Sequence, residues 1–127
     1  MKDVPNELKF DYVIAQSIFS HCGSDLISDW LDGVARHLQP TGLVLATFLI
    51  GDADFDGKGW IYPGCVRFTE PTMQKLANKS GLRLVLTDWM HPRQKWGVFM
   101  HSDMPSQWFE EKEISWNNKP ILYANNS

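Results

Sequence analysis

Residues 10–50 read FDYVIAQSIFSHCGSDLISDWLDGVARHLQPTGLVLATFLI, and this stretch decides the fold. At its two ends are short runs rich in apolar, β-branched and aromatic residues, FDYVIA at residues 10–15 and LVLATFLI at residues 43–50. Such runs are typical of buried strands. The segment between them predicts one amphipathic helix. A strand, a crossover helix and a second strand make a βαβ unit, which belongs to a parallel sheet covered by helices. We therefore expect an α/β fold.

The predicted helix has clear signals at both ends. Ser24 is the expected N-cap, and Asp25 places a negative charge in the first turn, where the helix dipole favours it. Pro40 and Gly42 are expected to end the helix. Between them, apolar residues recur at helical spacing and form one stripe: Leu26, Ile27, Trp30, Leu31, Val34, Ala35 and Leu38. The strand that follows is apolar on both faces, so we predict that it lies in the centre of the sheet.

The rest of the chain adds a loop, a second helix and a hairpin. Residues 51–67 form a long loop, and loops of this length in compact domains usually carry function. Thr69 is the expected N-cap of the second helix, and Gly81 its left-handed end. Residues 82–89 and 95–101 read as strands joined by a short turn, which predicts antiparallel neighbours. We expect one α/β domain of about four strands over residues 1–101. For residues 102–127 we expect a polar, partly disordered tail that can hold a short helix.

The composition is that of a cytoplasmic globular protein. Of the 127 residues, 43% are hydrophobic and 21% charged. The net charge of −3 gives no electrostatic basis for binding nucleic acid. No apolar run approaches the ~20 residues that a membrane helix needs, and residues 1–9 are too polar for a signal peptide. We therefore expect no membrane partner, and we expect Cys22 and Cys65 to be reduced thiols.

The order of these segments resembles the class I S-adenosylmethionine-dependent methyltransferases. FDYVIA, SIFSH, the helix closing on LQPTG, and LVLATF resemble the family's fourth strand, its following helix, a Leu-x-Pro-x-Gly turn and the fifth strand. The segment FTEPTMQKLANKSGLRLVLTDW resembles the next helix and strand, and QKWGVFM resembles the last, antiparallel strand. The resemblance covers residues 10–100. It implies a Rossmann-like partial sheet, the cofactor S-adenosylmethionine and methyl transfer to a small-molecule substrate.

The resemblance is confined to the C-terminal half of the family's fold. The family's first half carries a glycine-rich turn and an acidic residue that hold the cofactor, and neither has a counterpart here. The only G-x-G triplet, Gly57-Lys58-Gly59, lies in the long loop. This implies a truncated or split methyltransferase that is not catalytically competent alone, and it leaves open whether the chain binds the cofactor by itself. The alternative is a non-catalytic binding or assembly module that uses the half-fold for self-association.

The resemblance also implies an interaction surface. In the family the fourth strand pairs with the first, so here residues 10–15 would form an exposed, apolar sheet edge. Such an edge is a template for pairing with another chain. Our hypothesis is a homo-oligomer, or a complex with a complementary chain that supplies the missing strands.

Gln16, Ser17 and His21 follow the carboxyl end of the first strand. The resemblance implies that Gln16 and Ser17 contact the cofactor. It implies that His21 is catalytic, as a substrate contact or a proton acceptor, and histidine suits this role because it exchanges protons near neutral pH. The alternative is that the hydroxyls of Ser17 and Ser20 bond local backbone and that His21 packs at the start of the helix.

The long loop carries further candidates. Trp60 and Tyr62 are expected to line a substrate pocket, the alternative being that they only anchor the loop. His91 and His101 flank the hairpin and are expected at the surface.

The same loop opens with the D-x-D-x-D-G pattern of a calcium site, at Asp52, Asp54 and Asp56. That pattern requires a glutamate at its twelfth position, which is Pro63 here. We therefore expect no metal site, a weak cation site being the alternative, and instead an acidic lid on the substrate side that is solvated or disordered without ligand.

Overall fold

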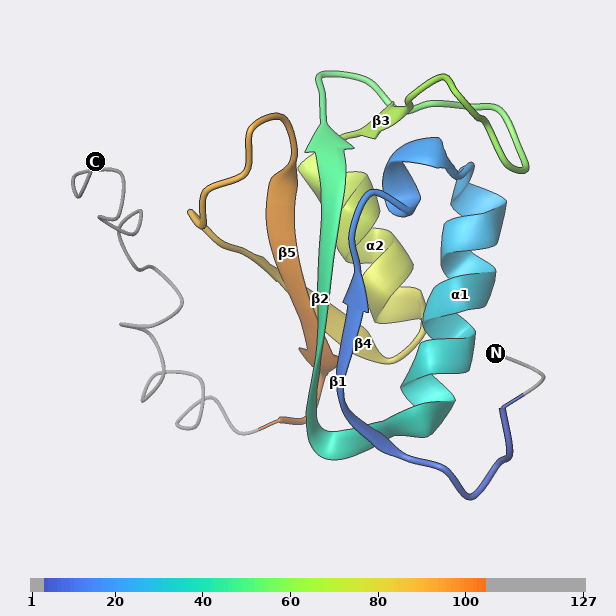
Figure 1. Cartoon of the computed structure of the whole chain (residues 1–127), viewed down its shortest axis with the longest axis vertical. Coiled ribbons are helices and arrows are strands. Elements are labelled where there is room, and N and C mark those ends of the chain that lie inside the picture. The colour runs from blue at the N-terminus through green and yellow to red at the C-terminus, as the bar shows by residue number, and fades with distance from the viewer. Residues whose placement is uncertain (1–3, 105–127) are drawn as a thin grey trace.

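The computed structural model describes residues 4–104 (Figure 1). Along the chain the elements are β1 (Phe10–Ala15), a 3-10 turn (Phe19–His21), α1 (Ser24–His37), β2 (Leu38–Ile50), β3 (Arg67–Phe68), α2 (Glu70–Lys79), β4 (Leu82–Leu86) and β5 (Lys95–His101). This order confirms the predicted α/β class.

The strands form one sheet in the order β1-β2-β5-β4. The short β3 pairs with the carboxyl end of β2. β1 and β2 are parallel, with Tyr12 opposite Leu43 and Ile14 opposite Leu45. β5 lies between β2 and β4 and is antiparallel to both. The central position of β2 and the antiparallel hairpin were both predicted, and both are confirmed.

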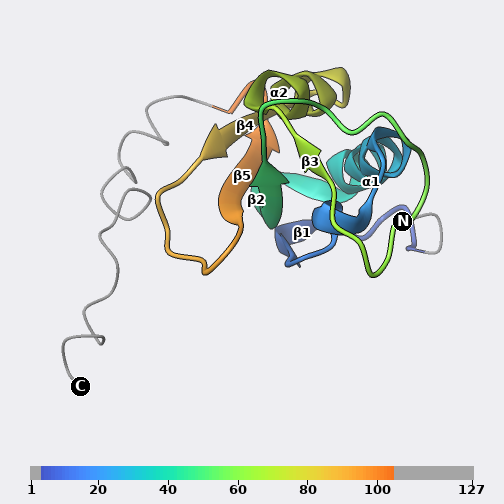
Figure 2. The same cartoon turned by 90° about the horizontal axis from the view of Figure 1, so that it is seen from above.

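Both helices cover the same face of the sheet (Figure 2). The core lies between them and the strands, and its largest fully buried side chains include four phenylalanines. Phe19, in the 3-10 turn, meets Trp30 of α1 edge-on at 5.2 Å between ring centroids and Phe99 of β5 at 6.0 Å. Burial of this apolar surface fixes the turn after β1 against both the helix and the sheet.

The other face of the sheet is also apolar. One cross-strand row on it runs Ile14, Leu45, Val98 and Val85. Within residues 4–104 no helix lies on this face. At the β1 end Ile14 is 68% exposed and Tyr12 69% exposed, whereas Val98 is fully buried. The edge strand β1 therefore exposes apolar side chains to solvent.

Two predicted boundaries around α1 are wrong. The N-cap is Gly23, without a side-chain hydrogen bond, and Ser24 is already helical. At the other end the helix stops at His37 and β2 begins at once, at Leu38, five residues earlier than predicted. Leu38 is buried in the core and lies opposite Phe10, so packing extends the strand through a segment that local signals assign to a turn.

The predicted ends of α2 agree better with the structure than those of α1 do. The Thr69 side chain accepts from the backbone N–H of Thr72, and Gly81 follows the helix with φ of +77°, as predicted. β4 ends at Leu86, three residues short of the prediction, and the two-residue β3 was not predicted. None of the helices in residues 4–104 has the length and apolar character to cross a membrane. The helix and the disorder predicted for the tail fall outside the described residues.

Candidate functional site

The carboxyl ends of β1, β2 and β4 lie at the same edge of the sheet, because these three strands are mutually parallel. Ligand sites of open α/β sheets lie at this edge. A cavity of about 490 Å³ is present here, which is in the range of small-molecule pockets. Side chains from the turn after β1, from the loop 51–66 and from the β4–β5 turn line it. We call it the strand-end cavity.

Ser17 connects the turn after β1 to strand β2 and to the β4–β5 turn. Its backbone is left-handed, with φ of +58°, which is uncommon for a residue other than glycine. Its N–H donates to Oγ1 of the buried Thr47 at 2.8 Å, and its Oγ accepts from Nε2 of Gln94 at 2.9 Å. Because the Ser17 hydroxyl accepts from an amide, its own proton stays available to a ligand.

His21 is held in a defined orientation. Its Nδ1 lies 2.7 Å from the carbonyl oxygen of Gly64 and 3.2 Å from that of Ile61. Carbonyls only accept, so Nδ1 carries a proton, and in the neutral ring Nε2 is the proton acceptor. The ring meets Tyr62 edge-on at 5.1 Å and lies 5.5 Å from the ring of Trp60. This arrangement can accept a proton from a bound molecule.

Hydrogen bonds hold the loop that supplies these contacts in place, so it is not a disordered lid, whereas Asp52, Asp54 and Asp56 are exposed to solvent, as expected. The Gly59 N–H donates to both carboxylate oxygens of Asp25, at 3.0 and 3.3 Å. The Ile61 N–H donates to the backbone carbonyl of His21 at 2.7 Å. The hydrogen bond from Gly59 is the main reason why the pKa of Asp25 lies below its ordinary value. Residues on α1 and on the turn after β1 thus hold the loop over the cavity.

The acidic pattern in the loop has a structural role. The Asp54 carboxylate accepts from the backbone N–H of Thr69 at 2.7 Å and from the hydroxyls of Thr69 and Thr72. These hydrogen bonds, that of Thr72 first, lower its pKa. In the described part of the chain, no three histidine, cysteine or acidic side chains lie together in a way that could hold a metal ion.

The structure brings together Ser17, His21 and Tyr62, which all line the strand-end cavity. Trp60 stacks on Tyr62, with ring planes 10° apart, and lines a different cavity. Gln16 is exposed and lines neither of these two cavities.

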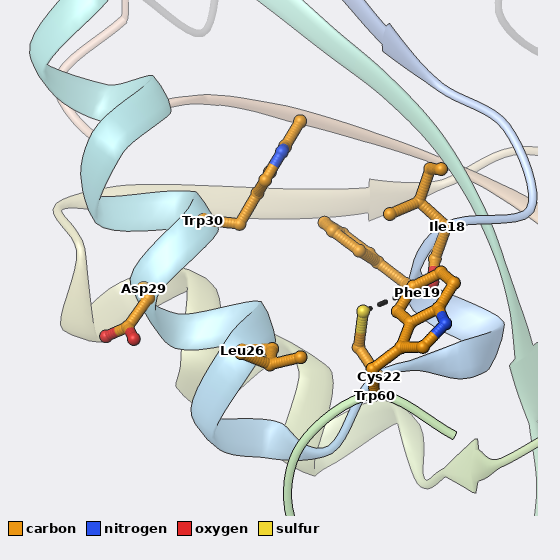
Figure 3. A pocket seen from close by; sticks show the side chains of 7 residues that line it. All are labelled: Ile18, Phe19, Cys22, Leu26, Asp29, Trp30 and Trp60. Atoms are coloured by element: carbon orange, nitrogen blue, oxygen red, sulfur yellow. Dashed lines mark hydrogen bonds between the residues drawn. The ribbon is translucent and has the colours of Figure 1, made fainter. Parts of the chain in front are cut away.

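The cavity beside Trp60 has about 340 Å³ and is mostly apolar (Figure 3). Leu26 and Trp30 of α1 form one wall, and Ile18 and Cys22 form the other. The Cys22 thiol donates to the Ile18 carbonyl at 3.3 Å. Burial, and then the negative charge of Asp25, raise the pKa of Cys22, so this thiol stays protonated and is a poor nucleophile.

Sequence reasoning did not place His91, Ser20 or Gln94 in the strand-end cavity, which all three line. His91, expected at the surface, is partly buried; its Nδ1 accepts from the backbone N–H of Arg93 at 3.1 Å and of Gln94 at 2.9 Å. Ser20 is 1% exposed, and its hydroxyl makes no hydrogen bond. Pro92 indicated a turn here, but no local signal shows that this turn returns to β1. His101, also expected at the surface, is partly buried and lies 3.0 Å from the Leu38 carbonyl, away from this cavity.

The fold is that of the class I methyltransferases. CalO1, a methyltransferase of calicheamicin biosynthesis with S-adenosylhomocysteine bound, matches with a TM-score of 0.58 and 17% identity over 78% of this chain. The mitomycin 7-O-methyltransferase MmcR matches at 0.61 and 15% identity, also over 78%. DesVI of Streptomyces venezuelae matches at 0.58 and 13% identity over the same share. The sequence itself matches no family model and no curated protein.

The chain spans only part of these proteins. The match covers 31% of CalO1, 31% of MmcR and 61% of DesVI. At such identities the likeness establishes the fold alone, and the fold does not fix the reaction. A structure described as a pericyclic reaction enzyme matches with a TM-score of 0.57 and 15% identity, over 75% of this chain and 27% of its own.

Proposed function

We propose that this chain forms the acceptor side of an S-adenosylmethionine-dependent methyltransferase that acts on a hydroxyl group of a small molecule. The observation that carries the proposal is His21, whose ring is oriented by the carbonyls of Gly64 and Ile61 with Nε2 left as the acceptor. It lies at the carboxyl edge of a methyltransferase-like sheet. The matching structures include the O-methyltransferases MmcR and NcsB1.

His21 is the proposed general base. S-adenosylmethionine, when bound, supplies a methyl group activated by the positive sulfonium. Nε2 of His21 would take the proton of the acceptor hydroxyl, which would make that oxygen a better nucleophile. The positive charge that forms on the ring is stabilised at Nδ1 by the two carbonyls. The remaining contribution is positioning of the acceptor in the cavity.

Ser17 and Gln16 are the proposed cofactor contacts. Ser17 fits this role because its hydroxyl proton is available and its strained backbone is held by Thr47 and Gln94. Gln16 fits because its side chain is exposed directly after β1. Ser17 and Gln16 can form hydrogen bonds with one side of the cofactor. The sequence has no glycine-rich turn for the other side, so we propose that a polypeptide paired with the β1 edge completes the site.

Calorimetric titration of the chain with S-adenosylhomocysteine tests this proposal. We expect binding with a micromolar dissociation constant in an oligomer of the chain, where a second copy paired with β1 completes the site. Ser17→Ala should weaken this binding about tenfold by removing one hydrogen bond in a partly buried setting. Gln16→Ala should weaken it less, because this side chain is more exposed. Ser102→Ala, at the opposite edge of the sheet, is the control and should change nothing. A folded chain that releases no binding heat would contradict cofactor binding by this chain.

A second candidate is a non-catalytic binding or assembly module. It is favoured by the exposure of Tyr12 and Ile14 on β1, which suits association independently of any reaction. A stable oligomer without affinity for S-adenosylhomocysteine would support it over methyl transfer.

A further inference from the structure

The two histidines of the strand-end cavity hold their protons on different ring atoms. Nδ1 of His21 faces two carbonyl oxygens and must carry a proton, which leaves Nε2 of the neutral ring as an acceptor. Nδ1 of His91 faces two backbone N–H groups, so it carries no proton, and Nε2 of His91 is a donor. Neither Nε2 bonds to a described residue. The cavity thus offers one fixed acceptor and one fixed donor.

Two further polar atoms of this cavity are without partners. The hydroxyl of Ser20 is buried and makes no hydrogen bond, and the same holds for Oε1 of Gln94, whose Nε2 is bound to Ser17. Buried polar atoms are normally paired, and leaving them unpaired is destabilising. Their presence in residues that line the cavity marks it as a constrained polar site.

The charge of the lining points to the chemistry of that ligand. Arg93 lies at the cavity and is exposed, and none of the described side chains that line the cavity is acidic. Leu49, Tyr62 and Pro92 provide apolar walls for a carbon skeleton. A positive charge without an acidic partner in the lining favours an anion, and a carboxylate makes its strongest hydrogen bonds with charged or strong N–H donors.

From these contacts we infer that the strand-end cavity recognises a small hydroxy acid. Its hydroxyl donates to Nε2 of His21, and its carboxylate accepts from Nε2–H of His91, with Arg93 adding charge. The role of this molecule as the methyl acceptor rests on the proposed function, but its binding does not. His91 is then a residue that determines specificity, and it takes no part in the proton transfer.

The probes are the ortho, meta and para isomers of hydroxybenzoate, with phenol and benzoate as partial ligands. Each is titrated into the full chain without cofactor, and the imidazole resonances are followed by NMR. One isomer, the one with the right spacing, should shift the signals of both His21 and His91. It should bind about tenfold or more tightly than phenol or benzoate, because each of these lacks one charge-assisted or buried hydrogen bond.

His91→Asn is the informative variant, because an asparagine oxygen can replace Nδ1 as acceptor for the turn while the Nε2 donor is lost. It should lower the affinity for the best isomer about tenfold, to the level of phenol, and leave phenol binding unchanged. His91→Asp keeps the same turn contact and adds a negative charge, so its loss should be larger. His101→Asn, outside the cavity, is the matched control.

The inference is overturned if no isomer binds better than phenol, or if His91→Asn weakens phenol and the hydroxybenzoate equally. The outcome is separate from that of the cofactor titration. Hydroxybenzoate binding without S-adenosylhomocysteine binding would keep the hydroxy-acid site and remove the transferase. The reverse would keep the transferase and remove this substrate class.

Discussion

The environments of the two cysteines differ in ways that set their reactivity. Cys65 is exposed at the strand-end cavity. Cys22 is 6% exposed, bonds to the Ile18 carbonyl, and has its pKa raised by burial and by Asp25. The thiolate is the reactive form of cysteine, so burial and a raised pKa both protect Cys22.

We therefore predict that a thiol reagent modifies the native chain in two phases. Cys65 reacts in the fast phase, and Cys22 reacts on the order of a hundredfold more slowly, because it must first be exposed by local opening. Stopped-flow or mass-resolved labelling at neutral pH measures both rates. Cys65→Ser should remove only the fast phase. Equal rates in the folded protein would contradict the packing of Cys22 shown in Figure 3.

The start of α2 depends on a residue far outside the helix. Thr69 caps the helix through its own side chain, and Asp54 accepts from both Thr69 and Thr72. These bonds lower the pKa of Asp54 from its ordinary 3.8. A carboxylate whose pKa is lower in the folded state stabilises that state above its ordinary value, and the contribution is lost as the pH falls through the folded value.

Asp54→Asn should lower the urea midpoint at pH values well above 3.8, because the charge-assisted bonds to Thr69 and Thr72 weaken. The difference from wild type should shrink as the pH falls below that value, where the wild-type carboxyl is also neutral. Urea unfolding followed by circular dichroism across this range measures it. Asp56→Asn on the same loop is the control, since no described residue bonds to that carboxylate. A pH-independent difference would contradict the role of the charge.

Within residues 4–104 the helices cover one face of the sheet, and β1 is an edge strand (Figures 1 and 2). Sheets built from βαβ units are ordinarily covered on both faces. The apolar row from Val85 to Ile14 runs across the face on which no helix of residues 4–104 lies, and Ile14 at its β1 end is exposed. This is the surface through which we propose that the chain associates with a second copy or with a complementary chain.

If the chain self-associates through β1, Ile14→Lys should convert the wild-type oligomer to a monomer, because a charge on an edge strand opposes pairing. Light scattering coupled to size exclusion measures the mass of both. Met90→Lys removes another exposed apolar side chain, 60% accessible and away from β1, and should leave the oligomer intact. A monomeric wild-type chain at high concentration would contradict self-association.

The sequence by itself determined the elements and most of the topology. β1 and β5 have the predicted bounds, and the parallel and antiparallel pairs follow from the lengths of their connections. These features are local, because period, caps and connection length are all contained in neighbouring residues. The exception is the start of β2, where burial of Leu38 overrides the helix-ending signals of Pro40 and Gly42.

Only the tertiary structure decided the composition of the site. Ser17 and Gln94 are 77 residues apart in the sequence and are joined by one hydrogen bond. The proton positions on His21 and His91 depend on carbonyl and N–H groups whose direction is set by the folded loop and turn. The sequence contained His21, Ser17 and Tyr62 as candidates, but it did not show that His91 and Gln94 lie beside them or that the hydroxyl of Ser20 lacks a hydrogen bond. The physical reason is that hydrogen-bond partners and burial depend on packing between distant segments, which local periodicity does not encode.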